Sequence, residues 1–169
     1  LYGFKIILIN NFDAKECVDK IVHYKANLIS VVPTMLSRLL KINKKSGIEK
    51  ILRAVILSGS HASSSLLKYA INNNMNIYKA YGMTESSSGI FGFWVKNNLK
   101  HIGSVGTPHN GVNFKIKDNN LLVKGAMIIN NYYDTKRNDN WYNTSDRAQV
   151  SKDGFLYIFG REGQFISGG

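Results

Sequence analysis

Short apolar segments alternate with amphipathic helical patterns along the first half of the chain, and this alternation narrows the possible folds most. The apolar segments read as strands and lie at residues 4–9, 27–32, 52–57 and 76–80. Between them, apolar side chains recur at helical spacing, over residues 14–25, after Thr34 and after Ser63. Strands that alternate with helices build parallel sheets through right-handed crossovers, which bring the connecting loops to one edge. The sequence therefore predicts an α/β fold with a parallel-sheet layer over residues 1–100.

Polar residues mark the expected helix starts. Asp13, three positions before Glu16, has the spacing of a capping box, and Thr34 and Ser63 are expected to cap the next two helices. The first apolar run, residues 4–9, is predicted to be a strand that begins almost at the first residue. Because no element precedes it to pair with or cover it, we expect the chain to be part of something longer.

The pattern changes after about residue 90, where turn signals separate short alternating segments. Residues 113–117 and 121–124 are predicted to pair across a turn at 118–120, and Asp153-Gly154 predicts a second hairpin. We therefore expect a small antiparallel β subdomain over residues 101–162. Residues 163–169 are interpreted as the start of an interdomain linker.

Composition narrows the possible partners. The formal charge of +11, from 22 basic and 11 acidic residues, fits either an anionic partner or a Lys- and Asn-rich composition with a site for anionic nucleotides. The lysines are scattered, so we expect no nucleic-acid partner. Cys17 is the only cysteine and is interpreted as a core residue rather than a nucleophile. No run reaches membrane-spanning length and no signal-type segment opens the chain, so a cytoplasmic location is expected.

The stretch Tyr81-Gly82-Met83-Thr84-Glu85 is the strongest candidate for a functional site. It follows the strand predicted at residues 76–80 and precedes a loop of serines and glycine. Tyr81 offers a flat face to a base, Gly82 allows backbone to approach a ligand closely, and the Thr84 hydroxyl can bond a phosphate oxygen. Glu85 can hold Mg²⁺, which commonly uses one or two carboxylates together with substrate phosphates. The alternative is that Tyr81 belongs to the core and Glu85 is a surface charge.

Several motifs occur in an order that resembles the adenylate-forming superfamily of acyl-CoA synthetases, peptide-synthetase adenylation domains and luciferases. They lie at residues 55–60, 81–89, 141–146, 153–161 and 166–169. The resemblance implies that a carboxylate attacks the α-phosphate of ATP to give acyl-AMP, and that coenzyme A then displaces AMP. It implies ATP (AMP) and Mg²⁺ as cofactors, and a small-molecule carboxylate and coenzyme A as partners.

The resemblance also implies roles for residues outside the central stretch. Ser58, Gly59 and Ser60 would line the adenine and acyl pockets, although they also fit a simple strand-to-helix turn. Asp146 would accept both ribose hydroxyls, and Arg161 would contact ribose and phosphate.

In the central stretch itself, the resemblance implies that Tyr81 packs against adenine, Thr84 bonds the α-phosphate and Glu85 binds Mg²⁺. Of the following serines, Ser86, Ser87 and Ser88 would border the acyl pocket.

The sequence departs from the family pattern at two places. Thr144-Ser145-Asp146 stands where Thr-Gly-Asp is usual, and serine tolerates a positive φ poorly, so the turn is expected to differ. Gly163, followed by Gln164, stands at the position of the family's hinge for domain rotation, where Asp, Lys or Ser is common.

Two family motifs are missing from the chain, namely the phosphate loop with its lysine and the C-terminal catalytic lysine. We therefore expect a fragment of the large N-terminal domain that does not adenylate efficiently alone. Among the subfamilies, the motifs of this sequence most resemble those of the o-succinylbenzoate–CoA ligases of menaquinone synthesis. Fatty acyl-CoA ligases, carrier-protein adenylation domains and an inactive nucleotide-binding remnant are the alternatives. The oligomeric state is not predicted.

Overall fold

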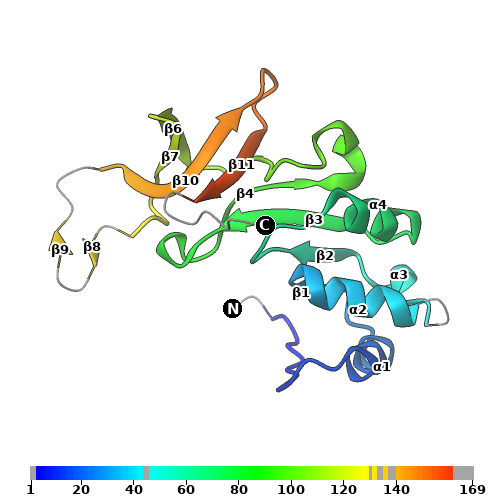
Figure 1. Cartoon of the computed structure of the whole chain (residues 1–169). Coiled ribbons are helices and arrows are strands. Elements are labelled where there is room, and N and C mark those ends of the chain that lie inside the picture. The colour runs from blue at the N-terminus through cyan, green and yellow to red at the C-terminus, as the bar shows by residue number, and fades with distance from the viewer. Residues whose placement is uncertain (1–2, 44–45, 130, 133–134, 137–139, 162–169) are drawn as a thin grey trace, which may run out of the picture. The chain divides into compact units, whose positions relative to one another are not determined.

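The computed structural model of the chain describes residues 3–43, 46–129, 131–132, 135–136 and 140–161 (Figure 1). The backbone forms two compact units. The first unit comprises residues 1–78 and 94–97, and the second comprises residues 79–93 and 98–169. Strand β3 (Ile77–Gly82) begins in the first unit and ends in the second. The predicted division near residue 100 into α/β and β subdomains stays a prediction.

The first unit contains the predicted alternation of helices and parallel strands. Its elements are α1 (Ala14–Tyr24), β1 (Leu28–Val31), α2 (Pro33–Asn43), α3 (Ile48–Ile51), β2 (Ala54–Leu57), α4 (Ser64–Asn72) and the start of β3. Strands β1 and β2 pair in parallel, from Leu28 opposite Ala54 to Val31 opposite Leu57. Strand β3 lies next to β2 in the sheet. The predicted α/β fold class is thereby confirmed.

Two of the three predicted caps are present. The Glu16 backbone N–H donates to Asp13 Oδ1 at 2.8 Å, and the Leu66 N–H donates to Ser63 Oγ at 3.2 Å. The cap predicted at Thr34 is wrong, because α2 already begins at Pro33. Proline suits a first helical position, where its fixed φ is helical and the missing N–H would have no partner within the helix.

The strand predicted at residues 4–9 is also wrong. This segment pairs with no strand among the described residues, and Phe4, Ile6 and Leu8 are 81%, 69% and 79% exposed. A strand requires the backbone of a neighbour, which an apolar run cannot supply by itself. The segment is instead held by Lys20 Nζ, which donates to the Leu8 carbonyl at 3.2 Å.

The second unit contains the predicted antiparallel sheet. Its elements are the end of β3, η1 (Thr84–Ser86), β4 (Gly89–Trp94, to Phe93), η2 (Val95–His101, from Asn98), β5 (Thr107–Pro108), β6 (Asn113–Lys117), β7 (Asn120–Lys124), β8 (Asn131–Tyr132), β9 (Thr135–Lys136), β10 (Tyr142–Val150) and β11 (Leu156–Arg161). Four strands form one sheet in the order β11-β10-β7-β6 (Figure 1). Phe91 of β4 and Leu121, Val123 and Leu156 of this sheet are fully buried in one hydrophobic core within the unit.

Both predicted hairpins are present. The β6–β7 turn contains Asp118 at φ 51° and Asn119 at φ 63°, the left-handed pair typical of a type I′ turn. The β10–β11 turn contains Gly154 at φ 82°. No helix in the described part of the chain is long and apolar enough to cross a bilayer.

Candidate functional site

In the loop that follows β3, the backbone at Gly82 lies against the backbone of Ser88 and Gly89. A Cβ atom at Gly82 would lie 2.1 Å from the Ser88 carbonyl oxygen, so no other residue fits there without moving the loop. Ser86 is 1% exposed, and its Oγ accepts a hydrogen bond from the Met83 N–H at 2.9 Å. Ser86 therefore fastens the loop, a role that the sequence interpretation of the three serines as a pocket border missed.

Thr84 and Glu85 lie together in the 3₁₀ turn η1. Thr84 is exposed, and Glu85 is half-buried. The Ile129 N–H donates to the Glu85 carbonyl at 2.7 Å, which ties this turn to the chain beyond β7. The turn thus carries a hydroxyl and a carboxylate at consecutive positions of the chain.

Asp146 lies at an irregular point of β10. The register with β7 shifts between Asn143 and Arg147, as in a β-bulge, and Ser145 within the shift has φ 60°. The Thr144 hydroxyl holds this turn: it donates to the Leu121 carbonyl at 3.0 Å and accepts from the Asp146 N–H at 3.1 Å. Serine thus adopts the left-handed conformation that glycine would take more easily.

Two donors from distant parts of the chain meet on the Asp146 carboxylate. The Tyr81 hydroxyl donates to Oδ2 at 2.5 Å. Arg161 Nε donates to Oδ1 at 2.9 Å, with Nη2 at 3.5 Å from Oδ2. Asp146 is only 5% exposed, and it lies directly opposite Arg161 in the β10–β11 register. The structure therefore brings Tyr81, Asp146 and Arg161 into one hydrogen-bonded group.

Electrostatics keep both donors of this group protonated. Burial raises the pKa of Tyr81, and the hydrogen bond to Asp146 and its negative charge raise it further. The hydrogen bond to Asp146 and its charge raise the pKa of the Arg161 guanidinium, and the negative charge of Glu85 adds to this. Glu85 is therefore close enough to Arg161 to interact with its charge. The group combines a fixed carboxylate acceptor, a phenol hydroxyl and a guanidinium, and the Glu85 carboxylate acts on the guanidinium through its charge.

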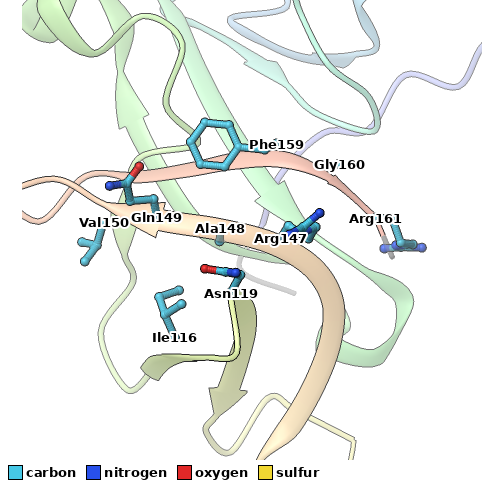
Figure 2. Close-up of a pocket in the computed structure, with 9 residues that line it drawn as sticks. All are labelled: Ile116, Asn119, Arg147, Ala148, Gln149, Val150, Phe159, Gly160 and Arg161. Atoms are coloured by element: carbon cyan, nitrogen blue, oxygen red, sulfur yellow. The ribbon is translucent and has the colours of Figure 1, made fainter. Parts of the chain in front are cut away.

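An open hollow of about 660 Å³ adjoins Arg161 (Figure 2). Arg147 and Arg161 contribute positive charge to it, and the Phe159 ring, 68% exposed, contributes an apolar surface. Asn119 and Gln149 add amide groups. Such a lining suits an anionic ligand with a planar or apolar part.

Ser58, Gly59 and Ser60 belong to the first unit, where they follow β2. The Ser58 N–H donates to the Val31 carbonyl at 3.2 Å, Gly59 has φ 89°, and Ser60 is exposed. They are thus described only within that unit, while Tyr81, Gly82, Thr84, Glu85, Asp146 and Arg161 all lie in the second. The predicted hinge at Gly163 and Gln164 and the motif at residues 166–169 lie outside the described residues.

The described residues contain no group of three or more His, Cys, Asp or Glu side chains placed to hold a metal ion. Glu85 is the carboxylate of the loop itself, and Asp146 is already bonded to Tyr81 and Arg161. A cation at this site would therefore need oxygen ligands from a bound molecule as well as from protein, which is the usual way in which Mg²⁺ binds with phosphates.

Comparison with known proteins gives a consistent result. A family model described as AMP-binding enzyme matches residues 1–133. A 2-succinylbenzoate–CoA ligase from Oceanobacillus iheyensis is 32% identical over the whole of this chain and 38% of its own length. A ligase of the same name from Listeria monocytogenes is also 32% identical, over the same shares. The chain spans about two fifths of the length of these relatives.

Solved structures match in the same way. An o-succinylbenzoate coenzyme A synthetase from Bacillus subtilis, in complex with ATP and a magnesium ion, aligns with a TM-score of 0.89 at 26% identity. The alignment covers 99% of this chain and 38% of that chain. The same enzyme in complex with the acyl-adenylate intermediate aligns with a TM-score of 0.89 at 25% identity, over 95% of this chain and 36% of that chain.

Proposed function

Because the chain belongs to the family of AMP-binding enzymes, we propose that it is part of an ATP-dependent, AMP-forming carboxylate–CoA ligase. The observation that supports this most is the buried Asp146 carboxylate, held by Tyr81 and Arg161 beside the loop of Glu85. A carboxylate fixed by charged and neutral donors suits recognition of a ribose diol. The reaction would activate a carboxylic acid as acyl-adenylate and transfer the acyl group to coenzyme A.

The ribose role of Asp146 follows from its remaining acceptor capacity. An ionised carboxylate offers about four lone-pair sites. The Tyr81 hydroxyl occupies one site on Oδ2 and Arg161 Nε occupies one site on Oδ1, while Arg161 Nη2 lies 3.5 Å from Oδ2. Oδ1 therefore keeps capacity for a further hydrogen bond, and Oδ2 keeps it when Nη2 turns to another acceptor. Arg161, with its side chain 48% exposed, can also reach a phosphate oxygen.

The loop residues are assigned to the phosphates. Thr84 would donate its exposed hydroxyl to the α-phosphate, and the ring of Tyr81 would face the adenine. Glu85 would hold Mg²⁺ together with phosphate oxygens, a donor set that suits this cation. When bound, Mg²⁺ neutralises phosphate charge. For the Ser58-Gly59-Ser60 turn, a role in lining the adenine and acyl pockets stays a prediction.

The carboxylate substrate we propose is 2-succinylbenzoate. The support is the 32% identity to ligases of that name over the whole chain. The protein would then serve menaquinone biosynthesis, and a reaction that uses ATP and coenzyme A fits a cytoplasmic location. A fatty acyl-CoA ligase and an inactive remnant remain outcomes of the test.

The test is carboxylate-dependent exchange of pyrophosphate into ATP. It uses the completed protein, by which we mean this chain within the flanking segments that bring it to the length of its relatives. We expect exchange with 2-succinylbenzoate and little with a fatty acid, and negligible exchange from the 169 residues alone. Exchange only with fatty acids would overturn the substrate, and no exchange with any carboxylate would favour the remnant. Robust exchange by the 169 residues alone would refute the fragment interpretation.

A further inference from the structure

We propose that Tyr81 is a positioning residue whose hydroxyl orients the Asp146 carboxylate toward the ribose diol; this rests on the proposed function. The two residues are separated by 65 positions and come together only in the folded second unit. Their hydrogen bond, at 2.5 Å, is at the short end for an O–H donor and a carboxylate. The hydroxyl of Tyr81 thus has a role in addition to the proposed contact between its ring and adenine.

The geometry of the carboxylate explains why this second donor matters. The terminal torsion of an aspartate is broad and roughly two-fold, so one donor leaves the plane of the carboxylate free to rock. Arg161 Nε holds Oδ1 at 2.9 Å from the neighbouring strand β11, but Arg161 Nη2 lies 3.5 Å from Oδ2, at the outer limit of a hydrogen bond. Tyr81 supplies the short contact to Oδ2, at 2.5 Å, from β3. With both oxygens held, the plane is fixed before a ligand arrives. Pre-organisation of this kind improves affinity because less freedom is lost on binding.

The ring and the hydroxyl of Tyr81 have separable contacts. The ring packs edge-on against Phe91, with centroids 6.0 Å apart and planes at 62°. Tyr81→Phe keeps this packing and the aromatic face, and removes only the hydroxyl. The substitution therefore isolates the effect on Asp146 from any stacking of the ring on a base.

The test compares ATP with 2′,3′-dideoxy-ATP, which lacks the ribose hydroxyls. In the completed protein, measured by calorimetry, Tyr81→Phe should weaken ATP binding about 10-fold, the scale of one hydrogen bond to a charged group. Binding of the dideoxynucleotide should change by less than about 2-fold, because no hydroxyl then depends on Asp146. Equal losses for both nucleotides would overturn the proposal, since they would place the hydroxyl's effect outside the ribose.

Two further variants sharpen the result. Tyr157→Phe is the matched control: its hydroxyl lies 2.7 Å from His101 Nδ1 in the same unit, and we expect no change for either nucleotide. In an Asp146→Ala background, Tyr81→Phe should have no further effect on ATP binding, and an additive loss would contradict the proposal. If the unsubstituted protein bound both nucleotides equally, the result would refute the ribose contact of Asp146, and with it the proposed site, whatever the effect of Tyr81→Phe. A failure of Tyr81 alone is therefore distinguishable.

Discussion

Lys79 Nζ donates a 3.3 Å hydrogen bond to the Ile102 carbonyl from a side chain that is only 5% exposed. Burial lowers the pKa of Lys79 from 10.5 to about 8, because a charged ammonium loses its hydration there. Lys79 thus places a charge inside the second unit, and the free-energy cost of burying that charge depends on pH.

The stability of the second unit should therefore rise relative to a Lys79→Met variant as the pH increases from 8 to 10.5. In that window the unfolded chain binds more protons than the folded chain, so raising the pH favours folding. Below pH 8 both states carry the charge, and the advantage of Lys79→Met should be largest. The difference in unfolding free energy should shrink by about 3 kcal/mol across the window, measured by urea denaturation. A difference that does not change with pH would contradict the burial of Lys79.

Ser145→Gly should stabilise the protein by about 0.5 kcal/mol. Serine at φ 60° carries a steric cost of about 1–2 kcal/mol, and the extra freedom of glycine in the unfolded chain offsets part of the gain. The hydrogen bond from the Ser145 backbone N–H to Asn143 Oδ1 does not involve the Ser145 side chain, so glycine can keep it. Thermal unfolding measures the change. Ser88→Gly, at an exposed position without a positive φ, is the control and should be neutral or destabilising.

Asp146→Ala should weaken ATP binding to the completed protein by about 1.5–3 kcal/mol, the scale of lost hydrogen bonds to a charged group. Calorimetry with ATP or an acyl-adenylate analogue measures it. Asp153→Ala removes a different carboxylate, one that contacts Lys100 and His101, and should leave the affinity unchanged. An unchanged affinity for Asp146→Ala would mean that the ribose binds elsewhere.

Glu85→Gln should slow adenylation by about 100-fold or more, comparable to the loss of one pre-organised electrostatic group. Thioester formation from supplied acyl-AMP should fall much less, because pyrophosphate and much of the phosphate charge have already left. Single-turnover assays of each half-reaction in the completed protein separate the two. Glu16→Gln, an exposed acid on α1, serves as the control. Equal losses in both half-reactions would make Glu85 a support of the loop instead.

Local signals predicted most of the fold. The Asp13 and Ser63 caps and the turns at residues 118–120 and 153–154 depend on neighbours within a few positions, so the sequence alone specifies them. The segment at residues 4–9 failed because strand formation depends on a partner that the local pattern cannot reveal. The short helix α3 (Ile48–Ile51) was missed, since four residues give too little periodicity to detect.

The sequence could propose the residues of the candidate site, but it could not show which of them contact one another. Asp146, Arg161 and Tyr81 each stand out through their motifs. The hydrogen bond between Tyr81 and Asp146 joins positions 65 apart, and no spacing rule connects them. The pairing of Asp146 with Arg161 is easier to predict from the sequence, because the hairpin between β10 and β11 sets their register.

The bulge before Asp146 makes the site sensitive to changes of chain length as well as to changes of side chain. Successive residues of a strand face opposite sides, so losing Ser145 alone would shift every later position of β10 to the other face. Buried Ala148 would then exchange places with exposed Arg147 and Gln149, and Asp146 would lose its pairing with Arg161. Homologous sequences that keep this site should therefore carry mainly Gly, Asn or Asp at the position of Ser145, and almost no insertions or deletions between Thr144 and Val150.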